Sequence, residues 1–182
     1  MMNIPNILTL INMSLGLCAV LLLIQTDHPH KAFISTALIM LGGIVDFFDG
    51  FIARKLNATS SMGKQLDSFA DIITFGTAPA LLINYISTCR PSILIIVSSL
   101  IFTVAGAYRL ARFNLSDYQD HFLGLPIPVA GIALAIYSAA YTLWPPVHPG
   151  ICTVITASFI IILSVMMVSK KKIKRIALHS IF

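Results

Sequence analysis

Apolar residues occur in long blocks along this chain, and short polar or proline-containing segments separate the blocks. An α-helix needs about 20 apolar residues to cross the roughly 30 Å hydrocarbon layer of a membrane, and blocks of that length recur here. A transmembrane barrel would need only strands of about ten alternating residues. We therefore predict an all-α integral membrane protein with six transmembrane helices. Their approximate bounds are 7–24, 32–52, 64–87, 92–113, 127–143 and 151–168.

The composition supports this class, because 57% of the 182 residues are hydrophobic, only 10% are charged and the mean hydropathy is +0.90. Nothing in the pattern indicates a separate soluble domain, so we expect residues 1–182 to form a single membrane domain. The first apolar block lacks the basic leader and small-residue cleavage pattern of a signal peptide, and we expect it to be retained as a span.

The distribution of positive charge predicts the orientation in the membrane. The formal net charge is +5, and the run KKKIKR at 170–175 favours a tail at an anionic membrane surface over a role in nucleic-acid binding. A cytoplasmic N-terminus leaves only Lys31 and Arg90 outside. The other ten Lys and Arg residues then lie inside: Arg54, Lys55, Lys64, Arg109, Arg112, Lys170, Lys171, Lys172, Lys174 and Arg175. Both termini are therefore predicted to be cytoplasmic, in a protein of the cell membrane.

Four aspartates interrupt the apolar pattern near the predicted cytoplasmic side. Asp46 and Asp49 are three residues apart, and Asp67 and Asp71 are four apart, so each pair lies on one face of its helix. An ionised Asp inside a membrane helix costs about 2.5 to 3.5 kcal/mol. Either some of these carboxylates are protonated or divalent cations lie between them.

The chemistry of the aspartates favours a hard metal ion, because only oxygen ligands are present and no His or Cys joins them. Such a ligand set is typical of Mg²⁺, Mn²⁺ or Ca²⁺. Two ions about 3.5 to 4 Å apart would suit displacement at phosphorus, since they neutralise phosphate oxygens and stabilise the leaving group. Phosphoryl chemistry is the leading hypothesis.

Small residues accompany both aspartate pairs. Gly50 and Ala53 follow the first pair, and Gly63 precedes the second. They would let a bulky group such as a nucleotide approach the helix backbone closely, although ordinary close packing of helices explains each residue equally well.

The stretch 46–71 resembles the CDP-alcohol phosphatidyltransferase family, whose signature is D-x-x-D-G-x-x-A-R-x8-G-x3-D-x3-D. All eight fixed positions are present within 26 residues: Asp46, Asp49, Gly50, Ala53, Arg54, Gly63, Asp67 and Asp71. Three further stretches are similar to the phosphatidylserine synthase branch of that family. They are NIPNILTLINMSLGL at 3–17, RLARFN at 109–114 and FLGLPIP at 122–128.

The resemblance implies a six-helix membrane enzyme that binds CDP-diacylglycerol with Mg²⁺ or Mn²⁺, transfers the phosphatidyl group to an alcohol and releases CMP. In this branch the alcohol is L-serine. Carried over to this sequence, Asp46, Asp49 and Asp67 are the principal metal ligands. Asp71 is the general base beside the metal site and is also counted among the metal ligands. The cytidine side is lined by Gly50, Ala53 and Gly63, and Arg54 lies near the nucleotide phosphates. A homodimer is also implied. No Ser, Cys or His is poised as a covalent nucleophile, so we expect direct attack of the alcohol on phosphorus.

Arg109 and Arg112 are candidates for the acceptor site. They lie three residues apart on one predicted helix face, and an Arg fork suits a carboxylate or phosphate. A structural role in fixing topology is the alternative. Phe122–Pro128 either closes over the acceptor or fixes the entry of the fifth helix, with the structural role favoured. Pro5, Asn6 and Thr9 are interpreted as a helix start capped by Asn6, with a secondary role near the nucleotide.

Two rival functions remain. Within the family, the acceptor could be glycerol 3-phosphate, inositol phosphate or a second lipid, although a phosphorylated acceptor would call for more basic residues than Arg109 and Arg112. Outside it, intramembrane carboxylates also occur in cation transporters, but those usually lie near the bilayer midplane.

Overall fold

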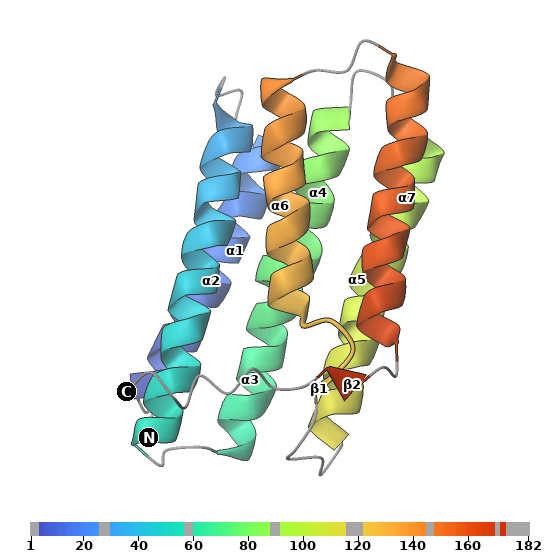
Figure 1. The fold of residues 1–182 in the computed structure, drawn as a ribbon. Coiled ribbons are helices and arrows are strands. Elements are labelled where there is room, and N and C mark those ends of the chain that lie inside the picture. Colours follow the sequence, from blue (N-terminus) through green and yellow to red (C-terminus); the bar gives the residue numbers. More distant parts are fainter. Residues whose placement is uncertain are drawn as a thin grey trace.

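The protein is a bundle of long, roughly parallel helices (Figure 1). The computed structural model describes residues 4–25, 30–56, 60–87, 92–115, 122–144, 148–169 and 172–173. Its helices are α1 (Ile4–Gln25), α2 (Lys31–Lys55), α3 (Ser61–Asp71), α4 (Ala78–Ile86), α5 (Ile93–Leu115), α6 (Ile127–Leu143) and α7 (Pro149–Val168). A π-helical segment, η1 (Ile72–Thr77), joins α3 to α4.

The prediction of a helical, multi-pass membrane protein is confirmed. Five described helical segments are long and apolar enough to cross a membrane, namely α1, α2, α5, the continuous stretch Ser61–Ile86, and α7 over residues 150–168. The sixth, α6, is apolar but has only 17 residues. The number of crossings and the side on which the termini lie stay predictions.

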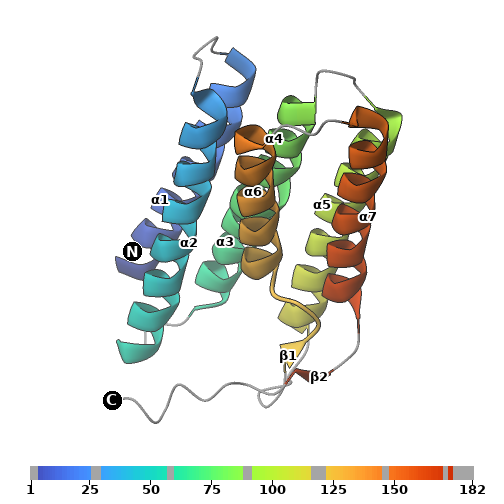
Figure 2. The same cartoon turned by 45° about the horizontal axis from the view of Figure 1, so that its top comes forward.

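Successive segments run in opposite directions along the bundle. The described chain starts at the lower end in Figure 1, where α2, α5 and α7 end and α3 and α6 begin. Figure 2 shows α4 and α6 between the α1–α2 pair and the α5–α7 pair. Fully buried apolar side chains, among them Phe75 of η1, Phe102 of α5 and Leu134 of α6, form the core, while large apolar side chains elsewhere are exposed, as lipid contact requires.

The segment η1 widens the third membrane segment directly after Asp71. Its cause is local, because Pro79 at the start of α4 has no N–H to donate to the carbonyl four residues earlier. The Thr77 hydroxyl donates to the Ile72 carbonyl at 3.1 Å, and Thr74 donates to the Asn12 carbonyl of α1 at 3.0 Å. The side chain of Thr74 therefore ties the widened turn to α1, one turn beyond Asp71.

Two short strands accompany the helical bundle. β1 (Phe122–Leu123) pairs antiparallel with β2 (Lys172–Ile173). Gly124 follows β1 with φ 74°, a left-handed conformation that suits glycine, and the Leu125 N–H donates to the Met166 carbonyl at 3.0 Å. Period-based reasoning missed this pairing because two-residue strands leave no periodic pattern and their partners are far apart in sequence.

Candidate metal centre and adjoining cavity

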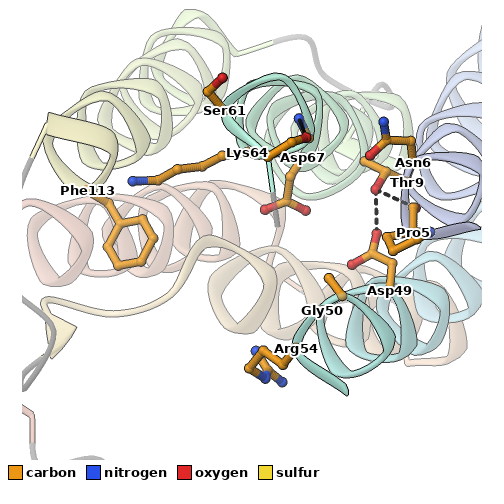
Figure 3. A pocket seen from close by; sticks show the side chains of 13 residues that line it. Pro5, Asn6, Thr9, Asp49, Gly50, Arg54, Ser61, Lys64, Asp67 and Phe113 are labelled. Atoms are coloured by element: carbon orange, nitrogen blue, oxygen red, sulfur yellow. Dashed lines mark hydrogen bonds between the residues drawn. The ribbon is translucent and has the colours of Figure 1, made fainter. Parts of the chain in front are cut away.

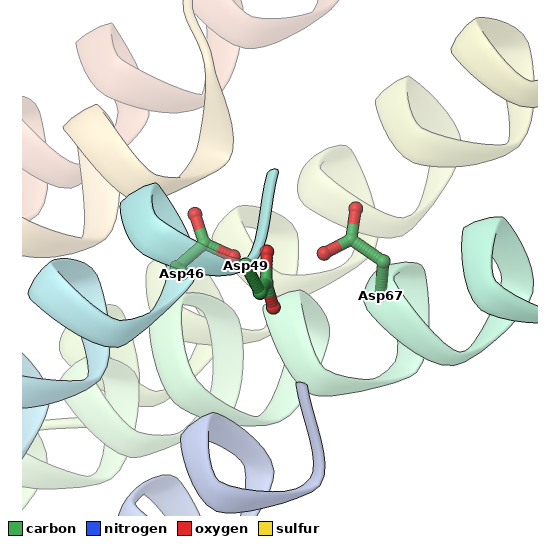
Figure 4. A group of neighbouring side chains, drawn as sticks. All are labelled: Asp46, Asp49 and Asp67. Atoms are coloured by element: carbon green, nitrogen blue, oxygen red, sulfur yellow. The ribbon is translucent and has the colours of Figure 1, made fainter. Parts of the chain in front are cut away.

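Three of the four aspartates meet between the end of α2 and the start of α3. Asp46 and Asp49 point from α2 towards Asp67 of α3 (Figure 4). One carboxylate oxygen from each of the three lies within 4.8 Å of the others. The spacing of three residues within α2 and the short connection to α3 together produce this convergence.

Asp71 extends the cluster deeper into the bundle. Its side chain is only 6% exposed, its carboxyl lies within hydrogen-bonding reach of Asp46, and its Oδ1 has no hydrogen-bond partner among the described residues. Two carboxylates at such a distance repel each other unless a proton or a cation lies between them. The group therefore needs positive charge that the neighbouring aspartates do not provide.

Helix α1 orients two of the carboxylates from outside the cluster. The Thr9 hydroxyl donates to Asp49 Oδ2 at 2.9 Å, and Asn12 Nδ2 donates to Asp46 Oδ1 at 3.3 Å. The Pro5 carbonyl is a second acceptor, 3.1 Å from the same hydroxyl, so the two acceptors share its single proton. Sequence reasoning gave Thr9 only a secondary role and did not single out Asn12, because nothing in a sequence pattern indicates that α1 packs along α2 at this level.

The residues present fit a hard divalent cation. Oxygen is the donor atom throughout, three carboxylates converge within coordination reach, and the buried Oδ1 of Asp71 has no partner in the described part of the chain. Thr9 and Asn12 then act as outer partners that fix the ligand orientation.

A cavity of about 520 Å³ opens beside the aspartates, between α1, α2, α3 and the end of α5 (Figure 3). Asp49 and Asp67 form part of its wall. The other lining residues are Pro5, Asn6, Thr9, Gly50, Ala53, Arg54, Ser60, Ser61, Gly63, Lys64 and Phe113. The structure thus brings all four residues expected on the nucleotide side to one cavity with two of the expected metal ligands.

The two glycines of this wall differ in what surrounds them. A Cβ at Gly50 would meet only the Arg54 guanidinium, at 3.6 Å, so this position is open to the cavity. A Cβ at Gly63 would lie 3.0 Å from Asn6 Oδ1 and 3.1 Å from Ser60 Oγ, both tight contacts. Close packing therefore explains Gly63, whereas Gly50 leaves room for a ligand.

Asn6 is not the helix cap that the sequence predicted. Residues 4–6 already lie in α1, so Asn6 lies inside the helix and its side chain borders the cavity. The capping role near this site belongs to Ser60, whose hydroxyl accepts a hydrogen bond from the Gly63 N–H at 3.0 Å.

Arg109 and Arg112 lie outside this cavity lining. Arg109 is 6% exposed, its Nε has no partner among the described residues, and Asp71 is near enough for their charges to interact. Arg112 instead donates to the carbonyls of Val168 at 2.9 Å and Ser169 at 3.3 Å. The two arginines predicted to act together therefore have different surroundings.

The sequence profile of the family described as CDP-alcohol phosphatidyltransferase matches residues 2–169. The chain belongs to this family. The match covers the aspartate cluster, the cavity and the seven helices described above.

Named relatives of the family agree with this membership. A Bacillus subtilis protein named CDP-diacylglycerol–serine O-phosphatidyltransferase is 38% identical over 179 residues, which cover 97% of this chain and 93% of the relative. A Methanocaldococcus jannaschii protein of the same name is 38% identical over 72% of this chain and 58% of its own length. A Methanothermobacter thermautotrophicus protein named archaetidylserine synthase is 34% identical over 95% of this chain and 70% of its own length.

Proposed function

We propose that this chain is an enzyme that transfers the phosphatidyl group from CDP-diacylglycerol to the hydroxyl of L-serine, giving phosphatidylserine and CMP. The observation that carries the proposal is the convergence of Asp46, Asp49 and Asp67 at the wall of a cavity also lined by Gly50 and Arg54. The names of the relatives support serine as the acceptor.

Asp46, Asp49 and Asp67 are the proposed ligands of Mg²⁺ or Mn²⁺, with Asp71 beside them, and two ions are expected. Bound there, the ions would neutralise the phosphate oxygens and the leaving CMP. Thr9 and Asn12 hold the Asp49 and Asp46 carboxylates in place through the hydrogen bonds described above.

Asp71 is the proposed general base. The serine hydroxyl oxygen forms a bond to the phosphorus that carries diacylglycerol, its proton passes to the Asp71 carboxylate, and the bond from phosphorus to the CMP oxygen breaks. Burial of Asp71 and its unpartnered Oδ1 support this assignment. We expect a single displacement, and the detection of a phosphatidyl–enzyme intermediate in single-turnover experiments would refute it.

The nucleotide is expected between Gly50, Ala53, Arg54 and Gly63. The open space at Gly50 supports close approach of the ligand to α2 there, and the Arg54 guanidinium beside it can bond phosphate oxygens. Gly63 acts by letting α3 approach α1.

Arg109 and Arg112 are proposed to hold the carboxylate of serine. Arg109 is the better supported of the two, because it is buried near Asp71 with an unpartnered Nε. Arg112 is less well supported, because it already donates to the backbone carbonyls of Val168 and Ser169. Phosphorylated acceptors remain the alternative within the family.

The site is expected at the cytoplasmic face of the cell membrane, where serine and the CDP-lipid head group are both accessible. The distribution of Lys and Arg supports this orientation. A homodimer remains an expectation from the family resemblance. The diacyl or ether nature of the lipid stays open, and an archaetidylserine synthase among the relatives makes both worth testing.

The decisive experiment is an acceptor panel with the purified protein. CDP-diacylglycerol and either Mg²⁺ or Mn²⁺ are supplied with L-serine, glycerol 3-phosphate or inositol phosphate, and CMP release is measured. We expect metal-dependent CMP release only when L-serine is the acceptor. CMP release with glycerol 3-phosphate or inositol phosphate instead would show that the acceptor is not serine. Metal uptake into vesicles without CMP release would favour a cation transporter.

A further inference from the structure

Lys64 lies in the cavity lining although it is outside the family signature. It follows Gly63 on α3 and its side chain extends across the cavity towards Phe113 of α5 (Figure 3). Arg54 lines the same cavity from α2. The cavity therefore has a cationic side chain on each of two different helices.

The present contacts of the Lys64 ammonium group are weak enough to be exchanged. Nζ donates to the Asn114 carbonyl at 3.2 Å and lies 5.4 Å from the centre of the Phe113 ring. Both contacts are at an exposed site, where a cation–ring interaction is weak. An ammonium group has three donors, so a ligand can be bound by a modest movement of this flexible side chain.

The position of Phe113 keeps this ammonium group at the edge of the cavity. The Asn114 Nδ2 atom donates to Ser68 Oγ at 2.8 Å, which links the end of α5 to α3. The ring and the carbonyl that contact Lys64 are thereby fixed relative to the helix that carries it. In this arrangement the ammonium group contacts the end of α5.

The charges of the cavity lining match a diphosphate. Asp49 and Asp67 face the proposed metal ions, which leaves Arg54 and Lys64 as the two cations of this wall. A nucleoside diphosphate ester carries one negative charge on each phosphate, and cations on two helices can contact both phosphates at once.

We propose that Lys64 is a specificity-determining residue that binds the diphosphate of the CDP-lipid opposite Arg54, leaving its contacts with Phe113 and Asn114 when the nucleotide enters. This inference rests on the proposed function. It differs from a role in serine binding, for which the carboxylate of the acceptor would be the anion that Lys64 contacts.

The test measures binding of CDP and of CMP to the full-length protein in detergent with Mg²⁺, by isothermal titration calorimetry. The central variant is Lys64→Gln, which keeps a hydrogen-bond donor for Asn114 but removes the charge. We expect CDP affinity to fall about tenfold and CMP affinity to fall less, because CMP lacks the second phosphate. Lys64→Arg should retain CDP affinity within about threefold of wild type.

Lys55 provides the matched control. It is an exposed lysine at the end of α2 that does not line the cavity, so Lys55→Gln removes the same charge from the same end of the bundle. Its CDP affinity should equal that of wild type. A comparable loss in both variants would mean a general charge effect and would overturn the proposal.

Steady-state kinetics separate the remaining outcomes. The proposal requires Lys64→Gln to raise the KM for CDP-diacylglycerol more than the KM for serine. It fails if CDP binding is unchanged, which would make Lys64 a link between α3 and α5 only, or if the KM for serine alone rises. If wild type binds neither CDP nor CMP, the proposed function fails as well, so the two failures are distinguishable.

Discussion

Charged side chains form two sites at the same end of the bundle. At one site the charge is bonded by backbone carbonyls, and at the other the charges line a cavity. In the first, which we call the Arg112 clamp, the guanidinium of Arg112 donates to the carbonyls of Val168 and Ser169 at the end of α7. In the second, the metal-side cavity, Asp49 and Asp67 face open space with Arg54 and Lys64 beside them.

The charge of Arg112 holds the end of α7 against α5. Carbonyls at a helix end have no partner within the helix, and a guanidinium is well suited to bonding two of them at once. Pairing of β1 with β2 and the bond from the Leu125 N–H to Met166 hold the same region. A substitution here should therefore affect stability before chemistry.

The charged side chains of the metal-side cavity are available to bind a ligand. Its aspartates repel one another in the absence of a cation, and Thr9 and Asn12 orient the carboxylates without neutralising them. An arrangement that opposes stability in this way is typical of a functional site. The comparison predicts that substitutions in the cavity change binding and catalysis with little loss of stability.

The largest effect is expected from Asp67→Asn, which removes one of three converging ligands but keeps the shape of the side chain. CMP release should fall by at least about a thousandfold, because metal and phosphate neutralisation are both lost. Thermal unfolding gives an independent measurement. Mg²⁺ should stabilise wild type and not the variant, while the metal-free variant should be at least as stable as wild type.

If Asp67→Asn lowers the stability of the metal-free protein, the Asp67 carboxylate contributes to the fold. The contrast between a stabilising Arg112 clamp and a ligand-binding cavity would then be wrong. Asn84→Asp serves as a control for altered charge at a partly buried polar contact. Asn84 donates to Ser99 Oγ at 2.8 Å in the contact between α4 and α5, outside the aspartate cluster. This variant should lower stability without abolishing the response to Mg²⁺.

Asp71→Asn sharpens the comparison by separating catalysis from binding within the cluster. If Asp71 accepts the serine proton, the rate of CMP release should fall by about 10² to 10⁴-fold. CDP affinity should change much less, because Asp71 does not line the cavity. Calorimetric titration with CDP checks the second expectation, and an equal loss of binding and rate would make Asp71 a metal ligand instead of the base.

The aspartate cluster was predictable because its geometry is local. Spacings of three and four residues set two carboxylates on one face of each helix, and a short connection brings the two helices together. The three carboxylates that converge in the structure, Asp46, Asp49 and Asp67, are the three that the family signature predicts as metal ligands. Hydropathy predicted the helix bounds to within a few residues, because hydropathy is also a property of neighbouring residues in the chain.

Contacts between distant parts of the chain were not predictable in this way. Asn12 reaches Asp46 only because α1 packs along α2, and Lys64 reaches the end of α5 across 50 residues of sequence. The segment η1 also escaped prediction, since a π-helical turn changes the hydrogen-bond register without changing the apolar composition. Pro79 was its one visible signal.

Thr9→Val tests whether the orientation of Asp49 by α1 contributes to the cavity. The substitution keeps the shape of the side chain and removes the 2.9 Å bond to Asp49 Oδ2. Outer partners of metal ligands typically contribute 10- to 100-fold in metal affinity, so we expect about a tenfold rise in the Mg²⁺ concentration needed for half-maximal CMP release. Thr36→Val is the matched control, because among the described residues the Thr36 hydroxyl donates to the Ala32 carbonyl within α2 and to no side chain. Equal responses of the two variants would remove Thr9 from the site.

The smallest effect on chemistry is expected from Arg112→Lys, and it bears most directly on the contrast between the two charged groups. Lysine keeps the charge but lacks the planar fork that reaches both Val168 and Ser169, so the free energy of unfolding should fall by about 1 to 2 kcal/mol. If Arg112 also contacts the acceptor, the KM for serine should rise a few-fold, and more than that for CDP-diacylglycerol. Chemical denaturation and steady-state kinetics on the same preparation measure both quantities.

A large, selective rise in the KM for serine at unchanged stability would move Arg112 into the acceptor site. The clamp would then be a resting contact that serine displaces, as CDP is proposed to displace the contacts of Lys64.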